Sequence, residues 1–330
     1  MRERRIDIRT VVGLALVAAL VFAVPVLTSD RYLLKVLTFV GVNVIIVTGM
    51  ALLFGYAGQV SLGHAAFYGI GAYTSAYVVS SLGWPWLTGV VLAVVLTCAG
   101  GLLLALPSLR LKGHYLAMAT LGFGEIMRVV FVEARGVTGG PDGFSGIPFA
   151  SVGGLTIDSA GGNYWLIWGV AAVVLAFAAN LVRSRAGRAM RALHGSESGA
   201  LACGIDLTGL KVRVFVISAA LAGLAGALYA HVVGFISPST FSLHVSVLLV
   251  AMAVLGGTRS LAGPVLATVL LTMIPFADAV IPGLSRSALE MIQEWQEDVY
   301  GLTIIAVLLF VPGGLAGALR RVSGWGRRAE

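Results

Sequence analysis

The chain has 330 residues, of which 58% are hydrophobic and 11% are charged, and its mean hydropathy is +0.95. Soluble domains carry roughly 25% charged residues, so this composition excludes an ordinary soluble domain. A formal net charge of +7 would suit nucleic-acid binding, but the basic residues cluster in short segments between apolar stretches, as in membrane proteins. We therefore expect the lipid bilayer, and no nucleic acid, as the surroundings of this chain.

A helix of about 20 apolar residues crosses a bilayer. The hydropathy pattern predicts an all-α, polytopic integral membrane protein of about ten transmembrane helices. The first expected span follows a basic start that resembles a signal peptide, but we expect it to be retained because the rest of the chain is membrane-embedded. The expected spans are 11–27, 33–54, 64–82, 87–107, 115–132, 164–182, 214–235, 245–255, 265–281 and 300–319.

The basic segments predict the orientation of the chain. If the N-terminus is cytoplasmic, most of the basic segments fall on the cytoplasmic side, as the positive-inside rule requires. Both termini are then cytoplasmic, the long loop 133–163 is outside, and the long loop 183–213 is inside. The break between the spans 245–255 and 265–281 is needed to keep the basic C-terminal tail inside.

A run of small and polar residues, Gly55–His64, separates the second and third expected spans. Backbone leaves a helix at membrane depth only where protein or a water-filled cavity satisfies its polar groups. Broken helices of this kind are typical of translocation paths. Gln59 and Ser61 suit a substrate or the broken backbone equally well. For His64, a structural hydrogen bond to the glycine-rich backbone is favoured over ligand binding.

Two charged residues in the fifth expected span, Glu125 and Arg128, are three positions apart. We expect an ion pair on one helix face, which lowers the cost of burying both charges, in preference to a gating role. The hypothesis for the translocation path combines the third and fifth spans with the break. It names Gln59, Ser61, His64, Tyr68, Tyr73, Thr120 and Glu125.

The inner loop 183–213 predicts two short helices. Ser196 can cap the second, Glu197 lies in its first turn, and Gly204 ends it. A positively charged loop that binds nothing and a docking helix for a cytoplasmic partner are equally compatible with this composition.

Several segments carry a resemblance to a known family. They are GYAGQVSLGHAAFYGIGAY (55–73), LRLKGHYLAMATL (109–121), TGGPDGFSGIP (138–148), 187–206 and FVISAALAGLAGAL (215–228). In order, and over most of the chain, these resemble the LivM-like permease subunits of branched-chain amino acid ATP-binding-cassette (ABC) importers. The resemblance implies one permease domain, 1–330, that moves branched-chain or related amino acids inward across the bacterial cytoplasmic (inner) membrane.

The resemblance also implies that the inner loop couples the permease to an ATPase. The coupling residues it implies are Arg188, Arg191, His194, Glu197, Ala200 and Gly204. The sequence departs from the family in having Gly199 before Ala200, where two alanines are usual. It also has Val311-Pro312 where an Arg-Pro pair is common.

The partners that the resemblance implies are a second permease subunit, two cytoplasmic ATPase subunits and an extracytoplasmic solute-binding protein. No GxxxxGK[ST] sequence occurs, so ATP and Mg²⁺ would be bound by the partner subunits, and no cofactor, catalytic residue or metal site is expected in this chain. The residues expected to contact the binding protein are Asp142, Asp158, Glu290 and Glu294.

An ion-coupled secondary transporter is the alternative function. Coupling to H⁺ or Na⁺ usually needs intramembrane carboxylates or broken-helix carbonyls, and Glu125 is the one clear carboxylate in the expected spans. A membrane-embedded enzyme ranks third, because the sequence contains no HExxH and no GxSxG.

Overall fold

The computed structural model describes residues 30–108, 114–257 and 260–279, with isolated positions before residue 30 and after residue 293. The expected spans 11–27 and 300–319 fall wholly or mostly outside the described residues, as does Glu290. Within the described residues the regular secondary structure is helical except for four two-residue strands, which confirms the all-α prediction. The number of spans stays a prediction.

The long helices of the described part occupy most of the expected spans. Their bounds are α2 (Arg31–Met50), continued by the π-helix η1 (Ala51–Tyr56), α3 (His64–Ser80), α4 (Trp86–Ser108), α5 (His114–Glu133), α7 (Ala160–Arg183) and α10 (Leu207–Val233). Five of these, namely α2 with η1, α4, α5, α7 and α10, are long and apolar enough to cross a membrane.

Shorter elements connect and complete the bundle. They are α6 (Arg135–Thr138), η2 (Gly140–Asp142), α8 (Arg185–Gly195), α9 (Glu197–Ala202), η3 (Pro238–Phe241), α11 (Leu243–Gly256), α12 (Ala262–Met273) and η4 (Ile274–Ala279). Strand β1 (Phe144–Ser145) pairs antiparallel with β4 (Phe235–Ile236), and β2 (Ser151–Val152) pairs antiparallel with β3 (Leu155–Thr156).

The turn region between α7 and α10 is built from capping residues. Ser184 accepts a hydrogen bond from the Gly187 N–H at the start of α8, and Ser196 accepts one from the Gly199 N–H at the start of α9. Gly204 has a φ of +74°, which glycine adopts without strain, and α9 ends just before it. The two predicted short helices and the predicted cap at Ser196 are confirmed.

Helices α3 and α10 cross so closely that their backbones are in direct contact. A Cβ on Gly71 would lie 2.1 Å from the Gly223 carbonyl oxygen, and a Cβ on Gly226 would lie 2.0 Å from the Tyr68 carbonyl oxygen. Small residues permit such close approach where lipid provides no hydrophobic drive between helices. The ridge Ala219–Gly223–Ala227 of α10 therefore packs within this subunit.

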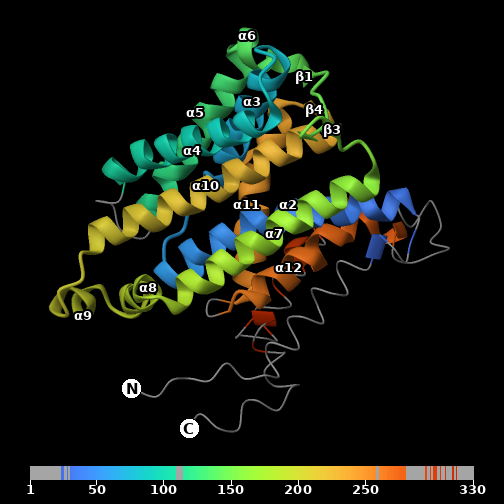
Figure 1. Cartoon of the computed structure of the whole chain (residues 1–330). Helices are drawn as coiled ribbons and strands as arrows, with labels where there is room; N and C mark the ends of the chain where they lie inside the picture. The colour runs from blue at the N-terminus through green and yellow to red at the C-terminus, as the bar shows by residue number, and fades with distance from the viewer. Residues whose placement is uncertain are drawn as a thin grey trace.

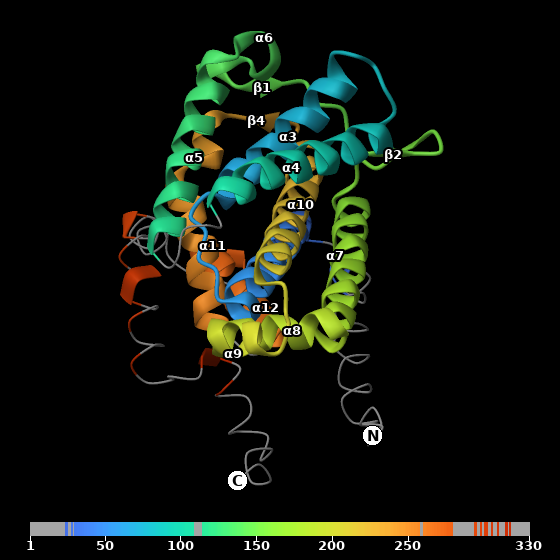
Figure 2. The ribbon, with the colours of Figure 1, turned by 90° about the vertical axis from the view of Figure 1, so that its left-hand side faces the viewer.

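The bundle has two distinct ends. Helices α8 and α9 lie at one end, and α6, β1 and β4 lie at the other (Figure 1). Figure 2 shows α5 and α7 on opposite flanks, with α3, α4 and α10 between them. We call these the α8 end and the α6 end. The break before α3 and the start of α11 lie within the bundle, where the candidate site is found.

Candidate functional site at the helix break

The break lies between η1 and α3. Helix α2 widens into the π-helix η1, a form that frequently marks functional sites, and the chain then leaves helical geometry. Gly58, with a φ of +68°, makes the turn after η1. The N–H groups of Gly58 and Gln59 donate to the carbonyls of Phe54 and Leu53, so the π-helix is closed at its end.

His64 is fully buried at the first residue of α3. Its Nδ1 lies 2.9 Å from Ser61 Oγ and its Nε2 lies 2.7 Å from Ser218 Oγ on α10. Both ring nitrogens are therefore occupied inside the protein. The partners are hydroxyl side chains and not the glycine-rich backbone that the sequence predicted, because α10 brings Ser218 to the ring.

Two further hydroxyl groups hold the break in place. Thr120 Oγ1 on α5 accepts a hydrogen bond from the Leu62 N–H at 3.0 Å. Ser246 Oγ on α11 accepts one from the Ala65 N–H at 2.9 Å. The broken backbone is therefore satisfied by side chains of neighbouring helices, as non-helical backbone at membrane depth requires.

Gln59 differs from the other polar residues of the break. Its side chain is 4% exposed, and neither its amide nitrogen nor its amide oxygen has a hydrogen-bond partner among the described residues. A buried amide without partners costs about 1–3 kcal/mol for each unsatisfied group. Among the side chains of the break, Gln59 is thus the one with buried polar atoms left without a partner in the described part of the chain.

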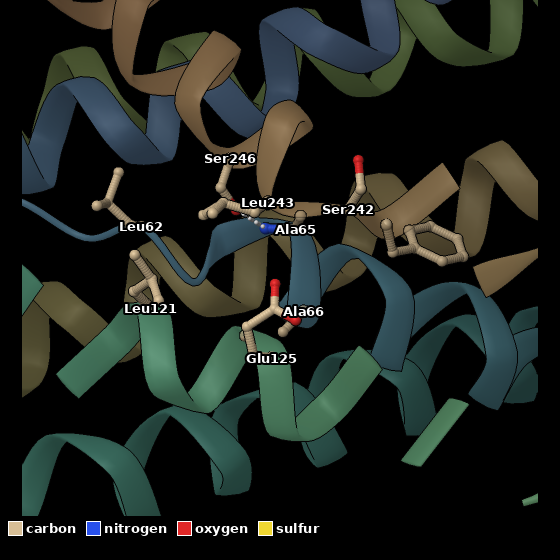
Figure 3. Close-up of a pocket in the computed structure, with 10 residues that line it drawn as sticks. Leu62, Ala65, Ala66, Leu121, Glu125, Ser242, Leu243 and Ser246 are labelled. Atoms are coloured by element: carbon tan, nitrogen blue, oxygen red, sulfur yellow. Dashed lines mark hydrogen bonds between the residues drawn. The ribbon is translucent and has the colours of Figure 1, made fainter. Parts of the chain in front are cut away.

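A small hollow lies beside the break (Figure 3). Its volume is about 10 Å³, which is space for about one water molecule. Figure 3 shows residues from the break, α3, α5 and α11 around it, with the hydrogen bond from Ala65 to Ser246 drawn across one side. The lining residues are Leu62, Ala65, Ala66, Leu121, Gly124, Glu125, Phe241, Ser242, Leu243 and Ser246.

Glu125 is the one proposed path residue that lines this hollow. Its carboxylate accepts a hydrogen bond from Arg128 Nε at 2.8 Å, so the predicted ion pair is present. The side chains of Glu125 and Arg128 are 41% and 47% exposed, however. The pair is therefore open at the flank of the bundle on which α5 lies (Figure 2).

Tyr68 and Tyr73 lie in an aromatic cluster and not in the hollow. The ring centroids of Tyr73 and Phe131 are 4.9 Å apart, and those of Tyr68 and Phe241 are 5.2 Å apart. Ser218 and Ser246 were not among the predicted site residues. The signal that could have found them is an isolated hydroxyl residue within an otherwise apolar helix, since such groups seek a partner on another helix.

The residues expected to couple to an ATPase already make contacts within this chain. Arg191 Nη1 donates to the Val182 carbonyl at 2.9 Å, and Arg188 Nη1 donates to the Arg183 carbonyl at 3.4 Å. These bonds satisfy carbonyls at the C-terminus of α7, where positive charge is favourable. Lys211 on α10 donates to Glu197 at 2.5 Å, which ties α9 to α10.

His194 connects α8 to the break. A Cβ on Gly58 would lie 2.9 Å from His194 Nδ1, so the imidazole sits directly against the backbone of the turn. Ala200 is buried between α9 and its neighbours, whereas Leu201 is 60% exposed and Gly204 is also exposed. Helix α8 therefore lies against the break, and α9 has a face that is open.

The expected binding-protein residues lie apart from these short helices. Asp142 belongs to η2 and Asp158 precedes α7, and both carboxylates are exposed in connections at the α6 end. Glu294 is exposed at an isolated described position, and Glu290 lies outside the described residues.

A helical bundle with apolar spans and a polar helix break held by internal hydrogen bonds defines a multi-pass membrane permease. Residues 32–308 match the family "Branched-chain amino acid transport system / permease component", and the chain belongs to this family. It is a transport subunit of the ABC importer class.

Curated relatives agree with this assignment. The chain is 34% identical over 327 residues to the high-affinity branched-chain amino acid transport system permease protein LivM of Salmonella typhimurium, and equally to that of Escherichia coli. Each alignment covers 92% of this chain and 74% of the relative. An autoinducer 2 import system permease protein, LsrC of Yersinia enterocolitica, is 30% identical over 47% of this chain and 42% of its own length. No solved structure matches the chain.

Proposed function

We propose that this chain is one of two permease subunits that carry branched-chain or related amino acids inward, driven by ATP that partner subunits bind with Mg²⁺ and hydrolyse. The observation that carries the proposal is the contact of His194 on α8 with Gly58 in the helix break. A movement imposed on α8 from outside the bundle reaches the break through this one side chain.

The open face of α9 is the proposed contact for an ATPase. Leu201 is 60% exposed at the α8 end, where Arg185, Arg188 and Arg191 of α8 are also exposed. A short helix that lays an apolar residue into a groove is a common recognition mode. Arg188, Arg191 and Glu197 hold α8 and α9 in position, while Leu201 and the residues around Gly204 meet the partner.

The exposed ion pair of α5 supports a second permease subunit. Glu125 and Arg128 lie in a helix apolar enough to span a membrane, yet both are more than two-fifths exposed. Charged groups that face lipid are expensive, so such residues almost always face protein or a water-filled path. A second permease subunit against α5 would cover the pair and place the hollow of Figure 3 at the shared interface.

The helix ends beside the hollow have suitable electrostatics for a solute with a carboxylate, whereas the hollow itself has room for about one water molecule. Helices α3 and α11 both begin at it, and the N-terminal end of a helix carries partial positive charge. Half-helix N-termini that point at anionic substrate groups are a known feature of transporters. Together with Gln59, these two helix ends form the proposed inner part of the path.

The remaining partners follow from the same orientation. With the α8 end in the cytoplasm and the chain in the bacterial inner membrane, both termini are cytoplasmic and the α6 end faces outward. A solute-binding protein then docks on the α6 end, where Asp142 and Asp158 are exposed, with Glu290 and Glu294 as further proposed contacts.

The test is affinity purification of the chain from gently solubilised native membranes, followed by mass spectrometry and reconstitution. We expect a P-loop ATPase and a second permease to copurify, and labelled leucine to enter proteoliposomes only with ATP and a binding protein. Leu201→Glu should release the ATPase, whereas the matched variant Leu201→Met should retain it. Uptake driven by an ion gradient without ATP would overturn the proposal in favour of a secondary transporter.

A further inference from the structure

A larger cavity lies near the α6 end of the bundle, away from the helix break. Its volume is about 280 Å³, which approaches the lower limit of about 300 Å³ for small-molecule pockets. It lies where the second and third turns of α2 and the first turn of α7 meet the last turn of α10. Under the orientation proposed above, it opens toward the outside.

The cavity has one positive and one negative group in its wall. Lys35 contributes an ammonium group from α2, and Asp158 contributes a carboxylate from the residue pair preceding α7. Neither forms an ion pair with any residue that the structure describes. Opposite charges that share a cavity without pairing with each other are suited to a ligand that carries both charges.

Asn163 provides a second, independent observation. It lines the same cavity from the first turn of α7 and is 7% exposed, yet its Oδ1 has no hydrogen-bond partner among the described residues. A buried amide oxygen without a donor is costly, and an N–H donor on a ligand would remove that cost. The cavity therefore offers two acceptors, Asp158 and Asn163, and one cationic donor, Lys35.

The ends of α7 and α10 at the cavity add one partial positive and one partial negative charge to those of Lys35 and Asp158. The N-terminal end of α7 is partially positive and the C-terminal end of α10 is partially negative, and residues from both line the cavity. The remaining wall includes Phe39, Phe149 and Val232, which are apolar. This combination suits a compact ligand with a zwitterionic head and an apolar body.

We infer that this cavity is a binding site for a zwitterion that carries an ammonium and an acidic group, such as an amino acid with an apolar side chain. The acidic group is held by Lys35, the ammonium by Asp158 and Asn163 Oδ1, and the apolar body lies against Phe39 and Val232. The inference rests on the proposed function in one respect, because that function makes the site the first stop of an amino acid released by the binding protein.

An ethanolamine phospholipid presents the same head-group chemistry from the membrane. The two sources are distinguished by binding of labelled leucine to the intact transporter complex in nanodiscs that contain no ethanolamine lipid, without the binding protein. We compare wild type, Lys35→Ala, Asn163→Leu and the control Arg31→Ala, which removes a positive charge one turn away that does not line the cavity. In parallel, lipid retained by each purified complex is measured by mass spectrometry.

We expect wild type and Arg31→Ala to bind leucine equally, and Lys35→Ala and Asn163→Leu to bind it at least roughly tenfold more weakly. Retention of ethanolamine lipid that is lost in Lys35→Ala, without leucine binding, supports the zwitterion site with a lipid as its ligand. Absence of both, or equal binding by wild type and Lys35→Ala, overturns the inference. ATP-driven leucine uptake by wild type is measured separately. Uptake without binding of leucine or lipid in the cavity would therefore overturn the inference and leave the proposed function intact.

Discussion

The imidazole of His194 lies against the backbone of Gly58, so that a Cβ at position 58 would come within 2.9 Å of Nδ1. These residues are 136 positions apart, and they join a short helix at the α8 end to the break that precedes α3. No side chain at position 58 separates the two, because the residue is glycine with a φ of +68°. The contact makes Gly58 the position where coupling can be tested most directly.

Gly58→Ala should weaken coupling between ATP hydrolysis and uptake. The added methyl group meets His194, and alanine at positive φ costs about 1–2 kcal/mol in addition. ATPase activity and leucine uptake of the reconstituted complex are measured together, and we expect uptake per ATP to fall. The matched control is Gly83→Ala, since Gly83 has a φ of +67° and nothing within 4 Å of a Cβ. Equal loss in both variants would assign the effect to backbone strain alone.

His64→Ala should destabilise the protein by about 2 kcal/mol or more, because it leaves the Ser61 and Ser218 hydroxyls buried without their partner. Thermal unfolding in detergent measures the change. A double-mutant cycle with Ser218→Ala should give a coupling energy of about 0.5–3 kcal/mol. His114→Ala, at an exposed position, is the control. Additive effects of His64→Ala and Ser218→Ala would contradict the hydrogen bond.

Gly71→Ala should prevent normal assembly of the bundle. Its Cβ would lie 2.1 Å from the Gly223 carbonyl oxygen, and backbone at a helix crossing cannot move aside without separating α3 from α10. We expect a large loss of folded protein in gel-filtration profiles of the solubilised membrane fraction. Gly169→Ala, in α7 with nothing within 4 Å, should fold normally. A well-folded Gly71→Ala variant would show that the crossing is looser than described.

Reversal of the Glu197–Lys211 pair tests what positions α9. Glu197→Lys alone should lower ATPase copurification, because two positive groups then repel each other between α9 and α10. The double variant Glu197→Lys/Lys211→Glu should restore it. The effect on the free energy of unfolding should stay within about 1 kcal/mol, since the carboxylate is 40% exposed. If the double variant stays defective, Glu197 acts on the ATPase itself and not through Lys211.

Much of the local structure follows from residues near one another in the chain. Ser196 begins α9 and Gly204 follows its end because a hydroxyl cap and a glycine act over three or four positions. The pairing of Glu125 with Arg128 is equally local, since residues three apart share a helix face. For such features the sequence contains all the partners, and the predictions were correct.

The same local reasoning could not supply the environment of those residues. Whether Glu125 is buried depends on where α5 lies in the bundle, and α5 is on a flank. Thr120 was expected in the path, but its hydroxyl holds the Leu62 N–H of the break. Arg188 and Arg191 also bond carbonyls at the end of α7, which the sequence did not indicate, and their contact with an ATPase stays a prediction.

The sequence by itself determined that this chain is a helical membrane permease, where its principal helix break lies, and which family it belongs to, because hydropathy, glycine content and motif order are properties of the chain. Only the tertiary structure decided which helices satisfy that break. Ser218, Thr120 and Ser246 come from three helices that are far from the break in sequence, and His194 reaches Gly58 from a fourth. The physical reason is that a polar group in an apolar bundle must find a partner, and helix packing alone determines which partner is within reach.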